Sequence, residues 1–556
     1  MKPILTLLTL LCSCAIWGQT TLDDLTRDLA ASMQQVHGPK DTYSQSLFPN
    51  STKPYQLTFQ RITTNDKNKS EDEKWTFNLA DIDPKLVRIE DSKEALRIYL
   101  RVQKGQKYIQ YFKNGELSGY ADQLIILGNG IDNAREVERK VLAAIPSAVD
   151  AWNKVADIGG RSNEQLVHRL MALVGEVSIG NTSYRQRLEQ VGDFPDRLRL
   201  TTEISTSKGS DREVLVWSFG DLKESGVRLV ISGTNAAVEA NTDDGLAWVY
   251  VERDGVQDDF SKEVSIRVAD PDQGKMVAAI LEKLIPYGKE QVKMRMPEAK
   301  TAPEAFGLVA GSMDKIARKN GDSEFSLEKD CQSKLTERIS SQGASSDLVY
   351  AFHFGDLDPK SVRLNMVKDR VEVSVSTEKK NLYVWSSKAG EQQNYGNEVV
   401  FQLADVEKGR QVVHLLPALI EQCPEAQNLG TFSDVQNWVS KGAKSEGGEA
   451  QSLDYASDSE VCKWKLIQSV TGDKKSSEST YEFNAYDIDP DQVKIIVSRK
   501  SVAVQLQTLK KENIISTIIN EKPGYTSTIQ LEAADVIAAK SLKVSLEQLL
   551  KQCKKE

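Results

Sequence analysis

A fifteen-residue block that recurs four times constrains the fold of this chain more than any other feature of its sequence. The first copy reads WTFNLADIDPKLVRI from Trp75 to Ile89, and the others begin at Leu215, Tyr350 and Tyr481. These block starts are 140, 135 and 131 residues apart. Such a period is too long for a solenoid unit and matches a whole small domain. The sequence therefore predicts four tandem copies of one domain.

Two further landmarks keep the same register. An aromatic residue lies 44 or 45 residues after each block start, and an aspartate opens the helix that we expect to close each copy. Recurring aromatic residues in a sheet belong more often to the core than to a ligand platform, so we expect core residues here. The aromatic residues are Tyr120, Phe260, Tyr395 and Tyr525, and the aspartates are Asp132, Asp270, Asp405 and Asp535.

Apolar residues alternate with polar ones inside the block, which predicts a half-buried antiparallel strand. The Asp-x-Asp-Pro element then ends the strand as a turn, and further strands follow. Helical apolar spacing precedes and follows each run of strands. We therefore expect an α+β fold of four tandem domains, each with an N-terminal helix, a six- to seven-stranded antiparallel meander or barrel and a C-terminal helix. The expected domains are 19–153, 154–288, 289–424 and 425–556.

The first 18 residues have the pattern of a secretory signal peptide, with Lys2, an apolar run over 4–11 and small residues before Gln19. We expect cleavage after Gly18 and export to the periplasm or the medium. Lipidation at Cys14 is the alternative. No later stretch approaches the ~20 apolar residues that a membrane-spanning helix needs, so we expect no transmembrane segment after the signal peptide.

The charge balance and the motifs exclude several classes of function. Acidic residues outnumber basic ones by 80 to 71, which argues against a nucleic-acid partner. The sequence has no zinc-protease helix, phosphate-binding loop or nucleophile elbow, so we expect no cofactor and assign no catalytic residue. The four histidines, which occupy different positions in the copies, are His37, His168, His353 and His414.

Four cysteines remain after the signal peptide, and the register of the copies pairs them. Cys331 and Cys462 each lie 19 residues before a block start, whereas Cys423 and Cys553 lie 73 and 72 residues after the same starts. Of the three possible connectivities, symmetry selects Cys331–Cys423 and Cys462–Cys553. A metal site or a reactive thiol is the alternative, but the close spacing of a CxxC pair is missing.

The Asp-x-Asp-Pro turns could carry chemistry, because paired carboxylates on a turn suit calcium. A calcium site needs six or more oxygen ligands, however, and no further acidic cluster recurs at a fixed offset. We therefore favour turn chemistry over a metal site. The aspartates concerned are Asp81 and Asp83, Asp356 and Asp358, and Asp487 and Asp489.

One basic residue occupies the same place in every copy, on the polar side of the strand after the turn. A solvated or internally paired cation is the ordinary interpretation, and a binding role is the alternative. The four residues are Arg88, Arg228, Arg363 and Lys494.

The strand, the D-[IL]-D-P turn, the aromatic residue and the closing helix together resemble repeats found in exported proteins of Bacteroidetes, and Gln19 after the cut is similar to that group as well. The resemblance implies an exported location and no site residues. A run of antiparallel strands closed by one helix also resembles the pleckstrin-homology-like barrel, which implies a fold and no ligand.

These observations favour a non-enzymatic exported protein whose four domains form a binding or scaffolding array, with an unknown protein or envelope partner. Tandem copies raise effective concentration, which favours binding over catalysis. The alternative is a hydrolase-type enzyme with its site in one copy or at a domain junction.

Overall fold

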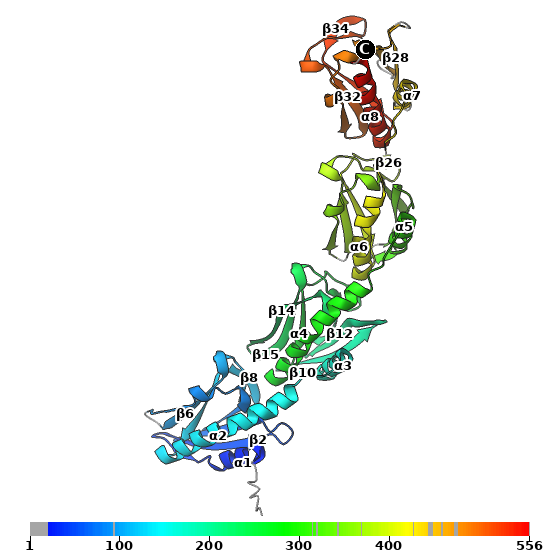
Figure 1. Cartoon of the computed structure of the whole chain (residues 1–556). Helices are drawn as coiled ribbons and strands as arrows, with labels where there is room; N and C mark the ends of the chain where they lie inside the picture. The colour runs from blue at the N-terminus through cyan, green and yellow to red at the C-terminus, as the bar shows by residue number, and fades with distance from the viewer. Residues whose placement is uncertain are drawn as a thin grey trace, which may run out of the picture. The chain divides into compact units, whose positions relative to one another are not determined.

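The computed structural model describes residues 21–554 apart from 93–94, 314, 319–320, 342–343, 369, 426, 443–448, 458–459 and 472–475. The predicted signal peptide, including Cys14, lies outside the described residues. The chain divides into two compact units, Met1–Met294 and Arg295–Glu556. Figure 1 shows the elements of both units in chain order.

Within each unit the strands form sheet pairs, each consisting of a larger and a smaller antiparallel sheet from one stretch of chain. In the first sheet pair the orders are β1-β2-β3-β4-β7-β8 and β5-β6-β9. Helix α1 (Leu22–Ala31) precedes the strands and packs against helix α2 (Ile131–Ala156), which follows them. The strands are β1 (Val36–His37), β2 (Asp41–Pro49), β3 (Gln56–Asn65), β4 (Ser70–Asn78), β5 (Arg88–Glu90), β6 (Leu96–Arg101), β7 (Ile109–Lys113), β8 (Glu116–Ala121) and β9 (Gln123–Gly128).

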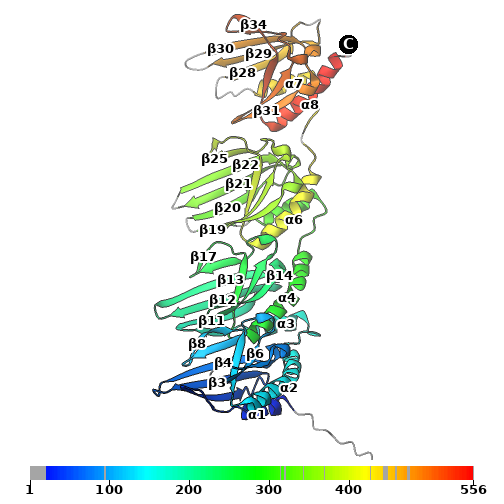
Figure 2. The same ribbon diagram turned by 90° about the vertical axis from the view of Figure 1, so that its left-hand side faces the viewer.

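The second sheet pair completes the first unit, with orders β10-β11-β12-β13-β16-β17 and β14-β15-β18. Its long strands β11 to β13 run side by side in Figure 2. Helices α3 (Asn163–Leu173) and α4 (Pro271–Met294) flank it in the chain and pack together. The strands are β10 (Glu176–Ile179), β11 (Thr182–Val191), β12 (Phe194–Thr206), β13 (Gly209–Ser218), β14 (Leu222–Ser232), β15 (Asn235–Thr242), β16 (Tyr250–Arg253), β17 (Val256–Gln257) and β18 (Glu263–Arg267).

The second unit begins with the third sheet pair, with orders β19-β20-β21-β22-β25-β26 and β23-β24-β27. Helices α5 (Ala302–Gly311) and α6 (Val406–Gln422) pack together beside it. The strands are β19 (Ile316–Arg318), β20 (Gly321–Leu327), β21 (Gln332–Ser341), β22 (Ala344–His353), β23 (Arg363–Val367), β24 (Arg370–Ser376), β25 (Trp385–Lys388), β26 (Glu391–Gln392) and β27 (Glu398–Leu403).

The fourth sheet pair has a five-stranded sheet, β28-β29-β30-β33-β34, and a three-stranded sheet, β31-β32-β35. Helices α7 (Phe432–Gly442) and α8 (Val536–Cys553) pack together beside it. The strands are β28 (Glu449–Tyr455), β29 (Lys463–Thr471), β30 (Ser476–Asn484), β31 (Lys494–Ser498), β32 (Ser501–Gln507), β33 (Ile515–Ile519), β34 (Lys522–Thr526) and β35 (Thr528–Ala533).

The expected α+β fold, with one six- to seven-stranded meander or barrel between two helices in each of four domains, is wrong. Strands make up 46% of the structure, so the protein is mainly β, and its strands lie in several separate antiparallel sheets. The physical reason is the Asp-x-Asp-Pro turn. It sends the chain from β4 into β5 and β6 of the smaller sheet, and β7 and β8 then return to the larger sheet. Alternation identifies a strand but does not specify which sheet the strand joins.

A buried glutamine joins the two sheets in three of the sheet pairs. In the second pair, Gln186 Nε2 donates to the Arg267 carbonyl oxygen at 2.9 Å, and the Arg267 amide donates to Gln186 Oε1 at 2.9 Å. Gln45 makes the same two bonds with Leu127, and Gln451 makes them with Glu532. Each glutamine side chain therefore pairs with a backbone N–H and a backbone carbonyl on the outer side of the edge strand of the smaller sheet, where no further strand is present to bond them.

The closing helices begin with a capping residue, as expected, although one cap differs from the prediction. Asp405 and Asp535 accept hydrogen bonds from the amides of Lys408 and Ala538, and Asp270 accepts one from the Gln273 amide. In α2, however, Gly130 is the N-cap, so Asp132 lies inside the first turn. Gly130 has a φ of +85°, which favours glycine over aspartate at this position.

Both predicted disulfides, Cys331–Cys423 and Cys462–Cys553, are present in the second unit. Each ties the end of a closing helix to the stretch before a sheet strand. Disulfides of this kind indicate an oxidising environment. None of the helices in the described part of the chain is long and apolar enough to cross a lipid bilayer.

Candidate functional site

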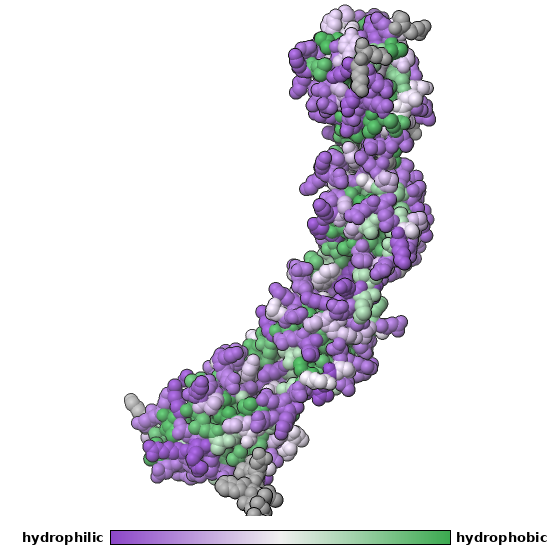
Figure 3. All heavy atoms as spheres, viewed as in Figure 1, coloured by the Kyte–Doolittle hydropathy of each residue, from purple (hydrophilic) through white to green (hydrophobic). Residues whose placement is uncertain are grey.

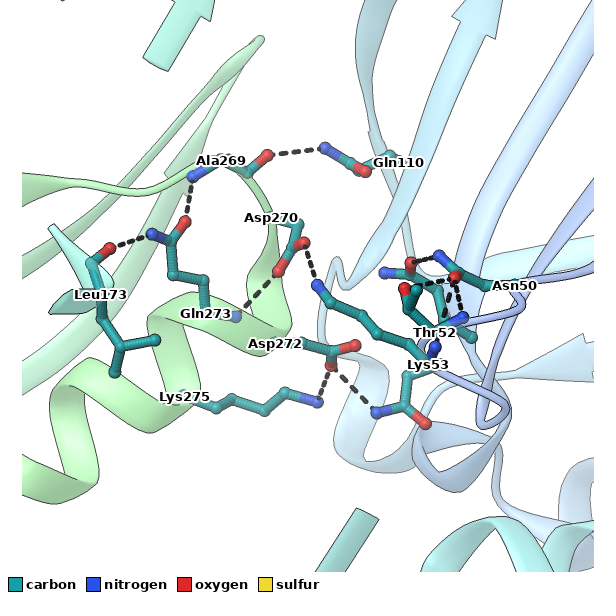
Figure 4. Close-up of polar contacts among 12 residues, drawn as sticks. Asn50, Thr52, Lys53, Gln110, Leu173, Ala269, Asp270, Asp272, Gln273 and Lys275 are labelled. Carbon is teal, nitrogen blue, oxygen red and sulfur yellow. Dashed lines mark hydrogen bonds and ion pairs between the residues drawn. The ribbon is translucent and has the colours of Figure 1, made fainter. Parts of the chain in front are cut away.

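A largely buried lysine, Lys275, joins the two sheet pairs of the first unit, and Figure 4 shows its ion pair with Asp272. Lys275 lies near the start of α4, and its Nζ is 2.7 and 2.8 Å from the two carboxylate oxygens of Asp81 in the first sheet pair. The same Nζ is 2.7 Å from Oδ1 of Asp272. Asn78 Nδ2, also from the first pair, donates to Asp272 Oδ1 at 3.0 Å. The first sheet pair therefore supplies both an acid and an amide to the beginning of α4.

Further polar contacts surround this lysine in Figure 4. Lys53 Nζ is 3.2 Å from Oδ2 of Asp270, the N-terminal cap of α4. Gln110 Nε2 donates to the Ala269 carbonyl oxygen at 2.9 Å. Tyr120 of β8 packs against the core of the second sheet pair. The first two sheet pairs thus meet through charged, amide and aromatic contacts.

The second unit repeats this arrangement at equivalent positions. Lys540 lies five residues after the N-cap Asp535, as Lys275 lies five residues after Asp270. Its Nζ forms an ion pair with Asp356, six residues after the third block start, as Asp81 is after the first. Lys540 and Asp356 are only 4% and 6% exposed. Both charges are therefore removed from water. In such surroundings, losing one partner of an ion pair leaves the other as an uncompensated buried charge, which strongly destabilises the fold.

Aromatic rings and a second acid complete both clusters. Lys275 Nζ lies 4.4 Å from the ring centroid of Trp152, and Lys540 Nζ lies 5.0 Å from that of Tyr383. Glu425 Oε1 is 3.0 Å from Lys540 Nζ. Burial favours a lower pKa for Lys540, but Asp356 and Glu425 outweigh it, so the pKa is raised. Asp272 and Asp81 raise the pKa of Lys275 against its burial in the same way. Both lysines are therefore cations.

The second unit also contains a cavity of about 530 Å³ between its third and fourth sheet pairs. This volume lies within the range of small-molecule sites, roughly 300–1,000 Å³. Strand β26 adjoins the fourth sheet pair (Figure 1), since Gln392 Nε2 donates to the Lys500 carbonyl oxygen at 2.9 Å. The charged and aromatic side chains of the lining, apart from His353, are Glu328, Asp330, Lys334, Asp356, Lys500, Asp535, Phe352, Tyr383, Trp385 and Tyr395.

His353 is the histidine of this cavity, and its ring caps a turn. The Gly355 amide donates to Nδ1 of His353 at 3.1 Å, which places the proton of the neutral ring on Nε2. Asn78 and Ser218 accept the equivalent bond in the first and second sheet pairs. Burial lowers the pKa of His353, although the carboxylate of Asp356 opposes the shift. The imidazole is therefore neutral near pH 7.

The two aspartates of each Asp-x-Asp-Pro turn have different surroundings. The second aspartate caps its own turn, with Asp83, Asp358 and Asp489 accepting hydrogen bonds from the amides two residues later. The first aspartate contacts a lysine in two cases, Asp81 and Asp356. In the described part of the chain, no three His, Cys, Asp or Glu side chains gather in a way that could hold a metal ion.

Asp487, the first aspartate of the fourth turn, is different. It accepts a hydrogen bond from Nδ2 of Asn484 in its own sheet pair at 3.4 Å. Asn484 occupies the place that Asn78 has in the first pair.

The four predicted basic residues are exposed and lie in four separate small sheets. Arg88 Nε is 2.6 Å from Glu90, and Arg228 forms an ion pair with Glu239 at 2.8 Å. Arg363 donates to the carbonyl oxygens of Lys360 and Val362. Lys494 is exposed at the start of β31. The structure does not bring these residues together at one site.

Sequence reasoning missed the residues that join the sheet pairs, although a signal was present. A basic residue lies five positions after the N-cap of every closing helix, and the set comprises Arg135, Lys275, Arg410 and Lys540. A large apolar or aromatic residue lies 33 positions after every block start, and these are Tyr108, Trp248, Tyr383 and Ile514. Neither set stands out as a motif, because its residues are single and widely spaced.

No protein-family model, curated protein or solved structure matches this chain.

Proposed function

We propose that this chain is a non-enzymatic binding or scaffolding protein built from four tandem copies. The observation that carries the proposal is the repeated lysine cluster. The polar residues at matching positions, such as Asp81 with Lys275 and Asp356 with Lys540, are used to join neighbouring sheet pairs. Side chains committed to buried ion pairs are poorly suited to proton transfer with a substrate, so the shared positions serve assembly.

The cavity of the second unit is the proposed binding site. Its walls combine the rings of Tyr383 and Trp385 with acids and lysines, including Asp330 and Lys334. A small number of polar groups set among aromatic walls is enough to orient a small polar ligand or a side chain of a protein partner. The partner chemistry that this lining suits is a group with a flat apolar face and hydrogen-bonding edges.

We further propose that the protein is exported. The pattern of residues 1–18 supports a signal peptide, and the two disulfides support an oxidising compartment such as the periplasm or the exterior. Resemblance to the exported repeat proteins of Bacteroidetes agrees with this location. Envelope or protein partners would meet the protein there.

A hydrolase is the second candidate function, because His353, Asp330 and Asp356 all border the cavity. Against it, Asp356 is paired with Lys540, and Nδ1 of His353 accepts a hydrogen bond from the Gly355 amide. A catalytic histidine would need its ring free to exchange a proton with substrate.

Affinity capture with the chain lacking residues 1–18 tests the proposal. The wild-type protein, Trp385→Ala in the cavity and Trp248→Ala in the first unit would each be exposed to native envelope extract. We expect the captured partner to be lost with Trp385→Ala and kept with Trp248→Ala. Turnover of ester, amide or glycoside substrates that disappears in His353→Asn would instead establish the hydrolase.

A further inference from the structure

The contact between sheet pairs uses the same positions in both units. The docking positions of the fourth sheet pair and the helix start of α2 take part in neither of these two contacts. One half of each contact is a docking face, which in the first and third sheet pairs consists of the first turn aspartate and two aromatic residues. The other half is a helix start with a basic residue five positions after its N-cap. The docking faces comprise Asp81, Tyr108 and Tyr120 in the first pair and Asp356, Tyr383 and Tyr395 in the third.

The fourth sheet pair carries the same docking positions, and the aromatic and apolar residues on them are exposed in the described part of the chain. Asp487, Ile514 and Tyr525 occupy the places of Asp356, Tyr383 and Tyr395. Tyr525 is 72% exposed and Ile514 is 43% exposed, whereas Tyr395 is 8% exposed because it packs into the core of the next sheet pair. Tyr395 is thus a core residue, as expected, but of the neighbouring sheet pair, whereas Tyr525 is exposed.

Further apolar side chains are exposed near these positions. Figure 3 shows hydrophilic residues over most of the side in view, with smaller apolar areas among them. Ile518 of β33 is 49% exposed, and it lies on the same face of the sheet as Tyr525, whose partner in β33 is Ser516. Neighbouring exposed apolar side chains of this size indicate a surface that another molecule covers.

The first sheet pair carries the matching helix start. In α2, Arg135 lies five residues after the N-cap Gly130, as Lys275 lies after Asp270. Asp132 occupies the place of Asp272, which accepts the hydrogen bond from Asn78. Arg135 is exposed, and the structure gives it no hydrogen bond or ion pair with any described residue.

We propose that the docking face of the fourth sheet pair binds the α2 helix start of a second copy of this chain, head to tail. Arg135 of the second molecule then contacts Asp487, as Lys275 contacts Asp81. Asn484 takes the place of Asn78 and donates to Asp132. Tyr525 and Ile514 become covered, as Tyr395 and Tyr383 are in the third pair.

The charges of the two faces agree with this occupant. The Lys53–Asp270 ion pair of the first junction has no counterpart, since Glu460 and Gly130 stand at those positions. An aspartate at position 130 would face Glu460, and glycine avoids this repulsion. A head-to-tail contact leaves one free face of each kind on every assembly, so association continues into a ring or an open chain.

The test uses sedimentation velocity on the chain lacking residues 1–18. We expect the weight-average mass to rise with concentration beyond that of a dimer. Arg135→Glu or Asp487→Arg alone should weaken association at least about tenfold, as expected for a charge reversal in an interface. Arg185→Glu, which reverses an exposed charge in the second sheet pair, should associate as the wild type does.

Mixing the two variants gives the sharpest result. The Arg135→Glu chain keeps an intact docking face, and the Asp487→Arg chain keeps an intact helix start. An equimolar mixture should therefore associate beyond a dimer again, because one contact regains the wild-type pair and the other brings the two reversed charges together as an ion pair. This recovery also shows that both variants are folded. A wild-type chain that stays monomeric at all concentrations, or a mixture that stays monomeric, would overturn the proposal.

Discussion

At the scale of single residues, the glutamines that bridge two sheets could not be predicted from the alternation of apolar and polar residues. Gln186 sits in β11 as one polar residue among several, such as Arg185 and Gln190 nearby. Only the three-dimensional structure shows that it alone reaches the backbone of β18. The sequence feature that could have identified it is a polar residue at an inward-facing position of an alternating strand.

Replacing Gln186 with alanine should lower the free energy of unfolding of the first unit by about 2 kcal/mol. The substitution removes the Gln186 partner from the half-buried amide and carbonyl groups of Arg267, and each buried group left unsatisfied costs roughly 1–3 kcal/mol before water enters. Gln190→Ala is the matched control, because Gln190 is exposed and makes a single bond to the Pro195 carbonyl. Urea unfolding of both variants measures the difference, and equal midpoints would contradict the role of Gln186.

His353 predicts a pH dependence of the second unit. Its folded pKa lies below the unfolded value of about 6.5, so the unfolded chain binds the proton more readily. The stability that the neutral ring provides is therefore complete above the unfolded pKa and decreases as the pH falls below it. His353→Asn should keep the cap, since Asn78 has the same role, and should remove this component.

Thermal unfolding between pH 7 and pH 5 measures the effect of His353. The wild type should lose more stability over this window than His353→Asn does. His414→Asn provides the control for a histidine at an unrelated position on α6. Identical slopes for the wild type and His353→Asn would show that the ring does not control the pH response.

At the scale of elements, local patterns predicted strands, turns and helices well and their arrangement poorly. The Asp-Pro turn after β4 is read correctly as a turn, because proline and a capping aspartate act within a few residues. The assignment of β5, β6 and β9 to a separate sheet depends on long-range packing, which alternation does not encode. The α+β barrel expectation failed at this step.

Replacing Lys275 tests whether its ion pairs fix the start of α4 against the first sheet pair. Lys275→Met removes the cation and leaves Asp81 and Asp272 as neighbouring carboxylates at a largely buried junction. Breaking a buried pair by removing one partner costs about 3–5 kcal/mol, and we expect the lower end because Lys275 is partly exposed. The loss should appear as faster hydrogen exchange at the start of α4 and along Asn78 to Asp81.

Lys289→Met is the matched control on the same helix. Lys289 Nζ is 2.9 Å from Asp243, but both side chains are well exposed, at 42% and 38%. Exposed pairs contribute about 0–1 kcal/mol, so exchange at the junction should stay unchanged. If Lys289→Met and Lys275→Met alter stability equally, the buried cluster does not hold the two sheet pairs together.

At the scale of the whole molecule, the regular spacing of the four sequence blocks was the most informative part of the sequence. It paired the four cysteines correctly, because equal offsets from two block starts took the place of missing distance information. Lys275 and Lys540, and likewise Tyr108 and Tyr383, also lie at fixed offsets, although nothing in the sequence marked them as junction residues. The spacing did not show which sheet pairs pack together, since a contact between two sheet pairs leaves no pattern within the sequence of either one.

The distribution of cysteines makes the two units respond differently to reduction. Both disulfides lie in the second unit, and the sequence has no cysteine between Cys14 and Cys331. Closing loops with sequence separations of 92 and 91 residues stabilises a fold by up to about 4–5 kcal/mol each in the chain-entropy model. A thiol reductant should therefore destabilise the second unit and leave the first unchanged.

Pulse proteolysis in increasing urea, with fragments assigned by mass spectrometry, resolves the two units in one sample. Fragments from residues 295–556 should appear at lower urea after reduction, whereas those from 21–294 should appear at the same urea as before. The double variant Cys331→Ser with Cys423→Ser should reproduce part of the shift without reductant, because Cys462–Cys553 remains. An equal shift in both units would mean that they unfold as one cooperative body, in which case the disulfides stabilise the entire chain.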